Sequence, residues 1–211
     1  RTPLATVRTQ AEVIHRGLEK SKNKTALREM IRAIDESSRS AGQLLDHAMV
    51  NFRADQFQTE AIDLRKLMAE TVERLSPTAE LKDISIITQD QGGDFDFDGD
   101  PILLQNALRN ILDNAIKYSP ADSNITVTLA RDAHNHILSF ADQGRGFAGA
   151  NLSDHLQRFK RGTNVNDIVG SGLGLTIVDE VARAHGGLVE ITNHTDPKGG
   201  GACVSFYLPL V

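Results

Sequence analysis

Asn110 and Asn114 stand one helical turn apart in residues 104–120, and Lys117 follows about one turn later. An amide oxygen can ligate Mg2+ without the extra charge of a carboxylate, and a lysine ammonium can meet phosphate. Asparagine is a mediocre helix former, so two of them inside one helix need an explanation. The alternative is that both amides are solvated on the polar face of an ordinary helix.

The apolar residues around these asparagines predict the helix that would position them. They recur every three to four residues, as in an amphipathic helix, at Leu104, Leu108, Ile111, Leu112, Ala115 and Ile116. Asp100 suits the N-cap of this helix, and Pro101 suits its first position. A second long helix is predicted over residues 173–185, directly before Gly186 and Gly187.

A carboxylate followed by two glycines forms a second cluster. Asp142, Gly144 and Gly146 come directly after an apolar strand pattern. A carboxylate at a strand end can accept a hydrogen bond from an amino group such as that of adenine. The glycines let the backbone approach a flat ring closely. Taken alone, the same Asp-x-Gly-x-Gly pattern is also typical of a simple turn.

Two further clusters could bind phosphate groups. Three cations surround Phe159 and could form either a mobile lid over phosphates or a solvated helix, namely Arg158, Lys160 and Arg161. Glycines alternate directly before the second long helix, at Gly170, Gly172 and Gly174. Backbone N–H groups and the positive dipole end of a helix N-terminus favour phosphate. Such glycines also suit a flexible hinge.

Residues 1–55 carry a narrow apolar seam. It steps by three and four residues, at Leu4, Val7, Ala11, Ile14 and Leu18, and after a polar turn it resumes from Leu27 to Phe52. This pattern predicts an antiparallel two-helix hairpin. A seam so narrow needs partner helices, so we expect a dimeric four-helix bundle. The alternative is that both helices pack onto the rest of the same chain.

After a polar linker at residues 53–60, the pattern changes, and residues 56–211 form the second predicted domain. A helix is predicted over residues 62–75, with Asp63 as N-cap and Pro77 just past its end. Strands are predicted over 84–89, 124–130, 136–142, 188–193 and 203–210, with a short helix near 151–159. This order predicts an α+β sandwich with helices on one face of a mixed sheet. A Rossmann site is excluded, because no glycine cluster follows a strand as G-x-G-x-x-G.

The composition is that of a soluble globular protein, with 40% hydrophobic and 24% charged residues. The net charge of −5, without a Lys/Arg-rich block, argues against a nucleic-acid partner. Cys203 is the single cysteine, so a reducing, cytoplasmic compartment is expected. No signal peptide or run of about 18 apolar residues is present, so no membrane contact by this segment is expected.

The order and spacing of the four clusters resemble the ATP-binding domain of sensor histidine kinases. These kinases belong to a wider ATPase superfamily that includes gyrase, the heat-shock chaperones and MutL-type repair proteins. The resemblance covers essentially the whole chain, because residues 1–4 (RTPL) match the end of the H-E-L-R-T-P-L box that opens the kinases' dimerisation and phosphoacceptor hairpin. It implies an ATP-dependent protein histidine kinase of a two-component signalling system.

The resemblance also implies roles for single residues of the first helix. Asn114 would ligate Mg2+, and Asn110 would lie beside it in the same ATP pocket. Lys117 would reach phosphate, and Tyr118 would line the adenine side. Asp113 matches an acidic residue that many family members carry, and it would orient a water or a Mg2+ ligand unless it is simply solvated.

The other clusters would complete the pocket. Asp142 would bind the adenine amino group, Gly144 and Gly146 would shape the ring pocket, and the cations around Phe159 would belong to a lid. That lid departs from the common F-E-R-F form, with Leu156 and Gln157 in place of Phe and Glu. The stretch that would hold the phosphates comprises Gly170, Ser171, Gly172, Leu173, Gly174 and Leu175.

The phosphoacceptor histidine of the family box falls three residues before Arg1, and none of the seven histidines present has that motif. We therefore expect this chain to bind nucleotide without labelling itself. Thr2 matches a threonine linked to dephosphorylation of the partner response regulator. The resemblance further implies a homodimer through the hairpin and a response regulator receiver domain as partner. The full-length protein is expected in the bacterial inner membrane.

Two other functions are compatible with parts of the pattern. A chaperone- or topoisomerase-like ATPase would hydrolyse ATP, but those relatives carry glutamate where this chain has Asn110, and an amide cannot deprotonate water. A degenerate scaffold would dimerise and dock a regulator without ATP. All four nucleotide clusters are intact, which argues against the scaffold.

Overall fold

The computed structural model describes residues 57–149, 152–156, 173–196 and 199–210, together with isolated helical positions between residues 27 and 48. The hairpin predicted over residues 1–55 therefore lies almost entirely outside the described residues. Its dimeric bundle and the domain boundary near residue 55 remain predictions. None of the described helices combines the length and the apolar character that crossing a membrane requires.

A mixed sheet forms one layer of the described domain. Its strand order is β2 (Ser85–Asp90), β4 (Asn124–Arg131), β5 (Asn135–Ala141), β7 (Gly199–Pro209) and β6 (Leu188–Asp196). β2 pairs in parallel with β4, and the other neighbours pair antiparallel. The predicted hairpin of β4 and β5 is confirmed. A separate ribbon pairs β1 (Glu60–Asp63) with β3 (Asp96–Gly99).

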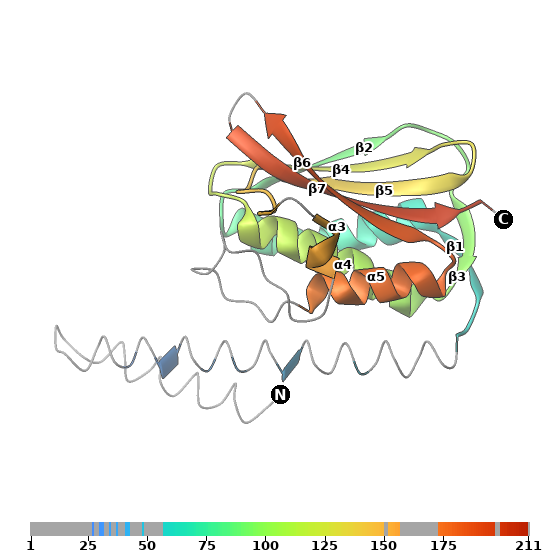
Figure 1. Cartoon of the computed structure of the whole chain (residues 1–211), viewed down its shortest axis with the longest axis horizontal. Coiled ribbons are helices and arrows are strands. Elements are labelled where there is room, and N and C mark those ends of the chain that lie inside the picture. The colour runs from blue at the N-terminus through green and yellow to red at the C-terminus, as the bar shows by residue number, and fades with distance from the viewer. Residues whose placement is uncertain are drawn as a thin grey trace.

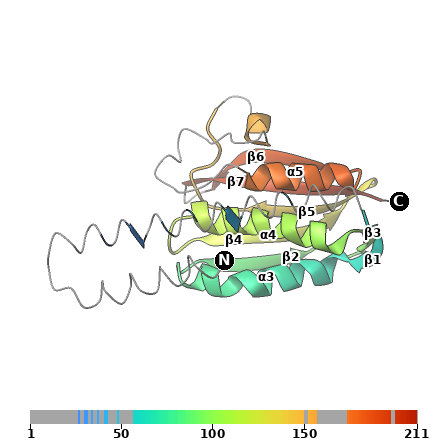
Figure 2. The ribbon, with the colours of Figure 1, turned by 90° about the horizontal axis from the view of Figure 1, so that it is seen from below.

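Helices cover one face of this sheet and form the second layer (Figure 1, Figure 2). They are α3 (Leu64–Glu80), α4 (Pro101–Tyr118) and α5 (Gly174–Ala184). Alternate side chains of β4 are buried beneath them, at Ile125, Val127 and Leu129. The predicted apolar stripe of α4 is buried along its whole length. The predicted α+β sandwich is confirmed.

Two predictions about the start of this domain are wrong. The helix predicted from residue 62 begins at Leu64, because Ile62 belongs to β1. The helix also continues through Pro77 to Glu80, although an interior proline loses a hydrogen bond and costs about 3 kcal/mol. The additional turn buries Ala79, whose carbonyl accepts hydrogen bonds from two following backbone N–H groups. This burial and bonding offset the cost of the proline.

The beginning of α4 is fixed by Asp100 and His185. As predicted, Asp100 caps the helix, and its carboxylate accepts hydrogen bonds from the N–H groups of Ile102 and Leu103 at 3.0 and 3.1 Å. The N–H of Asp100 donates to Nε2 of His185 at 3.0 Å. The proton is therefore on Nδ1, which donates to the Val181 carbonyl at 2.8 Å. The neutral His185 ring thus joins the end of α5 to the start of α4.

Lys82 fixes the other end of α4. Its ammonium donates to the carbonyls of Ile116, Lys117 and Ser119 at 2.9, 2.9 and 2.7 Å. The last carbonyls of a helix have no intrahelical partner, and a cation there also interacts favourably with the helix dipole. Burial lowers the pKa of Lys82, and the three hydrogen bonds compensate for that loss of solvent.

Replacing His185 with glutamine should weaken the pH dependence of stability. Burial lowers the pKa of His185, so the unfolded chain binds a proton more readily than the folded chain. The free energy of unfolding should therefore fall as the pH drops below about 6.5. In H185Q this decrease should be smaller, because the variant lacks the histidine that takes up the proton on unfolding. Loss of the bond to Asp100 should also cost about 1–3 kcal/mol at neutral pH.

The pH dependence of stability is measured by thermal unfolding of the chain above and below a pH of about 6.5. The matched control is His134→Gln, because His134 is exposed. If H185Q and H134Q show the same pH dependence, His185 does not act as described.

Candidate functional site

Asn110 and Asn114 meet the beginning of α5 at Gly174. Both amides are half-buried on α4. A Cβ atom on Gly174 would lie 3.2 Å from Nδ2 of Asn114 and 3.5 Å from Oδ1 of Asn110. At the shorter distance a Cβ atom would require the Asn114 amide to shift by a few tenths of an ångström, so glycine suits this close approach. The structure thus brings together three predicted residues from distant parts of the chain.

The Asn110 amide is oriented by its own helix. Its Nδ2 donates to the backbone carbonyl of Asn106 at 2.8 Å, and its oxygen lies on the side of Gly174. Within the described residues, the Asn114 side chain has no hydrogen-bond partner. Both amides therefore have polar atoms available for a ligand between α4 and α5.

The N-terminus of α5 presents backbone donors at the same place. No side chain caps the helix at Leu173, which is itself buried. The first N–H groups of a helix have no intrahelical acceptor, and the dipole adds partial positive charge, so a phosphate can bind there. The described part of the predicted glycine-rich stretch comprises Leu173, Gly174 and Leu175, whereas Gly170, Ser171 and Gly172 lie outside it.

Asp142 is buried, with 7% of its surface exposed, and one of its oxygens is already paired. Oδ1 accepts hydrogen bonds from the N–H groups of Gly144 at 2.8 Å and Ala202 at 3.2 Å. Burial raises the pKa of Asp142, while these donors and the nearby His194 lower it. The described residues supply no donor to Oδ2. One oxygen of a fixed carboxyl group therefore remains to accept a hydrogen bond from a ligand.

The loop after β5 packs on the end of α4 and against β6. A Cβ atom on Gly144 would lie 2.7 Å from the carbonyl oxygen of Tyr118, so only glycine fits there. Gly146 has a φ of +65°, in the left-handed region that favours glycine. Asn193 holds the next residue through two hydrogen bonds: its Oδ1 accepts from the N–H of Phe147 at 2.7 Å, and its Nδ2 donates to the Phe147 carbonyl at 2.8 Å.

Asn193 and Lys82 support the site, and the sequence interpretation missed both. Asparagine is depleted in strands, which is the signal that could have singled out Asn193 within the strand predicted over residues 188–193. Lys82 follows α3 in a polar turn, where lysine is ordinary. Its contact with α4 is set by tertiary packing alone.

The remaining predicted residues of α4 lie on two sides of the helix. Lys117 and Tyr118 are half-buried at its end, and Nζ of Lys117 lies 5.0 Å from the centre of the Tyr118 ring, a cation–π distance. Asp113 is exposed. Because successive residues of a helix are about 100° apart, Asp113 lies off the face that carries Asn110 and Asn114.

Residues 152–156, which precede the predicted lid, are among the described residues. A short 3-10 helix, η1 (Leu152–Leu156), lies where a helix was predicted near residues 151–159. The hydroxyl of Thr176 in α5 donates to the Leu156 carbonyl at 3.1 Å, so η1 is attached to α5. Like Gly170, Ser171 and Gly172, four further predicted residues lie outside the described part of the chain, namely Arg158, Lys160, Arg161 and Thr2.

A known protein family matches the part of the chain that carries this site. A family model described as histidine kinase-, DNA gyrase B-, and HSP90-like ATPase matches residues 99–211, more than half of the chain. The chain belongs to this ATPase family. The matched region contains α4, the Asp142 loop and α5, which carry the predicted nucleotide residues that the structure describes.

The curated relatives that the chain resembles are named as sensor kinases. The chain is 33% identical over 194 residues to the sensor protein QseC of Salmonella typhi. It is 31% identical over 225 residues to the signal transduction histidine-protein kinase/phosphatase MprB of Mycolicibacterium paratuberculosis. These alignments cover 92% and 100% of the chain but 42% and 40% of the relatives. The chain therefore spans less than half the length of these relatives.

Solved structures agree with that likeness. The mycobacterial sensor histidine kinase MprB superposes with a TM-score of 0.63 and 30% identity, covering 71% of this chain and 97% of that one. Full-length ShkA, solved in complex with AMPPNP, superposes with a TM-score of 0.70 over 99% of this chain and 43% of its own. At 23% identity, ShkA shows a shared fold. The resemblance to sensor histidine kinases is confirmed.

Replacing Gly174 with alanine should separate ligand binding from stability in this chain. Gly174 is the first residue of α5, where the advantage of alanine is smaller than the roughly 1 kcal/mol of a helix interior, so the variant should fold with little change in its unfolding temperature. Its methyl group would lie 3.2 Å from Nδ2 of Asn114 and would require that amide to shift by a few tenths of an ångström. Nucleotide affinity should then fall about tenfold or more, equivalent to about 1.4 kcal/mol.

Calorimetric titration with Mg-ADP measures this affinity. Gly200→Ala is the matched control, because its Cβ would meet nothing nearer than the His194 carbonyl oxygen at 3.7 Å. Unchanged affinity in G174A would argue against a ligand between Asn114 and α5.

Proposed function

We propose that this chain is the ATP-binding catalytic part of a sensor histidine kinase, which holds ATP while its γ-phosphoryl group is transferred to a histidine. The main support is Asn110, whose amide oxygen lies beside Gly174 at the start of α5. The family resemblance places a glutamate there in ATPases that hydrolyse ATP. An amide cannot take a proton from water, so this position favours transfer over hydrolysis.

Asp142 supports adenine as the base that the pocket accepts. Its Oδ1 is held by two backbone N–H groups, which fixes the direction of Oδ2. Adenine presents an amino group as donor where guanine presents a carbonyl oxygen. A fixed carboxylate oxygen therefore favours adenine and repels guanine. Gly144 adds no side chain beside this carboxylate, because a Cβ atom there would lie 2.7 Å from the Tyr118 carbonyl oxygen and 2.9 Å from Oδ1 of Asp142.

The start of α5 beside Asn110 and Asn114 suits the phosphates and Mg2+. Mg2+ prefers oxygen ligands and is usually held by one or two protein groups together with substrate phosphates. The Asn114 and Asn110 amides beside Gly174 fit that requirement. The described residues contain no group of three or more His, Cys, Asp or Glu able to hold a metal ion by themselves. Bound Mg2+ would neutralise charge on the phosphates, with Asn114 as its protein ligand.

The same proposal extends to the complete protein. The phosphoacceptor histidine would lie upstream of Arg1, on a hairpin that dimerises through residues 1–55. The phosphoryl group would then pass to an aspartate in the receiver domain of a response regulator. Thr2 would take part in dephosphorylating that regulator, and segments beyond this chain would anchor the protein in the bacterial inner membrane. The lengths and names of QseC and MprB support this extension.

Replacing Asp142 with asparagine should lower the ratio of ATP affinity to GTP affinity. The amide oxygen would still accept from Gly144 and Ala202, so the amide NH2 would face the base. Two N–H donors would then face each other at adenine, and the loss of binding free energy should be about 1–3 kcal/mol, or about 5- to 150-fold in affinity. The guanine carbonyl could accept from the same NH2 group.

Competition titrations with ATP and GTP measure that ratio. Asp83→Asn is the matched control, since Asp83 is exposed and has a φ of +55°, which asparagine tolerates. An unchanged ratio in D142N would exclude Asp142 as the group that reads the base.

Phosphoryl transfer itself is tested with γ-labelled ATP. The 211-residue chain should bind ATP without retaining label, whereas the complete protein should gain an acid-labile, base-stable label, because its acceptor histidine would be present. Asn114→Ala in the complete protein should abolish that label. An acid-labile label on the 211-residue chain would contradict the proposed acceptor position. Absence of ADP binding at about 1 mM would instead favour a scaffold.

A further inference from the structure

The hydrogen bonds between β5 and β7 change at Asp142. The two strands pair antiparallel as far as Ala141 and Cys203, so Asp142 and Ala202 are the next residues opposite each other. Residues at a hydrogen-bonded position exchange two backbone bonds, because each N–H donates to the carbonyl of the other residue. Here the N–H of Asp142 donates to the Ala202 carbonyl at 2.8 Å. The Ala202 N–H does not return the bond to the Asp142 carbonyl.

The Asp142 side chain takes this donor instead. The Ala202 N–H donates to Oδ1 of the carboxylate at 3.2 Å, beside the bond of 2.8 Å from the Gly144 N–H. The carboxylate is therefore held by a donor that the backbone of the same residue would otherwise use. A buried carbonyl without a partner costs free energy, so the Asp142 carbonyl needs a donor from elsewhere.

His194 supplies that donor. Its Nε2 lies 2.9 Å from the carbonyl oxygen of Asp142. Because a carbonyl oxygen can only accept, Nε2 carries the proton and donates. His194 belongs to β6, which β7 separates from β5 in the sheet. The ring therefore reaches across one strand to the end of another.

Gly201 makes room for this contact. It is the residue of β7 that lies opposite His194 in the pairing with β6. A Cβ atom on Gly201 would lie 2.7 Å from Nε2 of His194 and would overlap the carbonyl oxygen of Asp142. The histidine ring and the carbonyl oxygen can meet because no side chain stands between them.

We propose that His194 is a positioning residue that sets the selectivity of the site for adenine, an inference that rests on the nucleotide-binding role proposed for Asp142. By donating to the Asp142 carbonyl, His194 leaves the Ala202 N–H to the carboxylate. Without His194 the carbonyl and the carboxylate compete for that N–H, and the regular strand bond can replace the carboxylate bond. Oδ1 then keeps one donor instead of two, and the direction of Oδ2 is no longer fixed.

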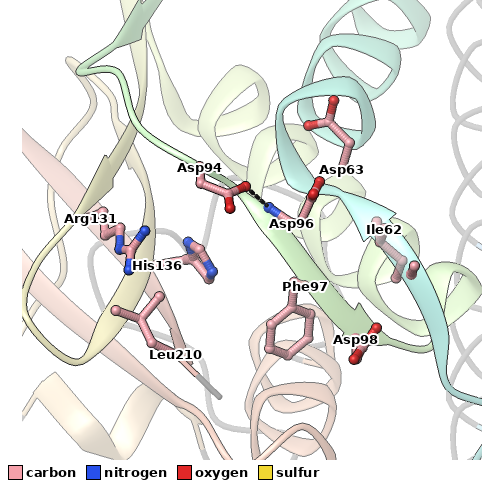
Figure 3. Close-up of a pocket in the computed structure, with 10 residues that line it drawn as sticks. Ile62, Asp63, Asp94, Asp96, Phe97, Asp98, Arg131, His136 and Leu210 are labelled. Atoms are coloured by element: carbon pink, nitrogen blue, oxygen red, sulfur yellow. Dashed lines mark hydrogen bonds between the residues drawn. The ribbon is translucent and has the colours of Figure 1, made fainter.

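A cavity of about 520 Å3 at the opposite end of β5 offers a different place for a ligand. Arg131 and His136 line it, whereas Asp142 and His194 do not (Figure 3). A nucleotide whose base contacts Asp142 is therefore bound outside this cavity. Arg131→Gln should leave ATP affinity unchanged, and it serves as the control for phosphates bound in the cavity.

Two variants of similar size separate the donor of His194 from its bulk. Glutamine and methionine are both unbranched, but only glutamine carries N–H donors near the position of Nε2. His194→Met should lower the ratio of ATP affinity to GTP affinity about fivefold, the effect of one hydrogen bond. His194→Gln should retain the ratio of the unchanged chain within about twofold. Competition titrations with ATP and GTP measure the ratio in the 211-residue chain.

The pKa of the Asp142 carboxyl tests the contact without any nucleotide. The Ala202 N–H lowers this pKa, and the charge of His194 lowers it as well. Both variants lack that charge, so the comparison between them isolates the hydrogen bond. The pKa of Asp142, followed by 13C NMR of its carboxyl carbon, should be higher in H194M than in H194Q. His134→Met makes the same substitution at an exposed histidine and should change neither the pKa nor the affinity ratio.

Equal affinity ratios and equal Asp142 pKa values in H194M and H194Q would overturn the proposal. A loss of selectivity of the same size in both variants would also overturn it, because bulk rather than the donor would then matter. If the unchanged chain binds neither ATP nor GTP while the pKa difference persists, the nucleotide proposal fails and the positioning of Asp142 by His194 stands. Weaker ATP binding in R131Q would place the phosphates in the cavity and reject Asp142 as the base-reading group.

Discussion

Fixing both ends of α4 is the constraint on which the nucleotide site depends. Lys82 donates to the carbonyls of the last turn, and His185 accepts from the N–H of the N-cap residue Asp100. The two contacts come from the ends of α3 and α5, so three helices are joined. Buried backbone groups without partners cost free energy, and these contacts supply partners at both ends of α4. Asn110 and Asn114 are thereby placed against the start of α5.

The proposed ligand contacts use polar atoms that the fold orients but does not pair. Oδ1 of Asp142 is held by two backbone N–H groups, while Oδ2 remains available. The Asn110 amide nitrogen is bound within α4, and its oxygen lies toward Gly174. Such preorganisation suits phosphoryl transfer, in which the protein mainly positions the reactants and neutralises charge. The site therefore needs accurate placement by glycines and helix ends more than it needs a reactive side chain.

Much of this fold could be predicted, because its signals are local. Asp100 and Pro101 mark the start of α4, and the alternating strands and apolar helix stripes follow directly from side-chain periodicity. The exceptions arise where burial outweighs local preference. Pro77 lies inside α3 because the turn beyond it buries Ala79. Ile62 reads equally well as helix or strand, and it became a strand because β3 was available as its partner.

The sequence by itself determined which residue types are present for the chemistry and how they are spaced within each element. Asn110 and Asn114 share a helix face whatever the rest of the chain does, because 3.6 residues make one turn. Only the tertiary structure decided that Gly174 lies against those amides and that Asn193 holds the backbone of Phe147. The tertiary structure also decided that Lys82 donates hydrogen bonds to the carbonyls at the end of α4. These contacts join residues far apart in the chain, and their geometry follows from packing the helices on the sheet, which no local spacing encodes.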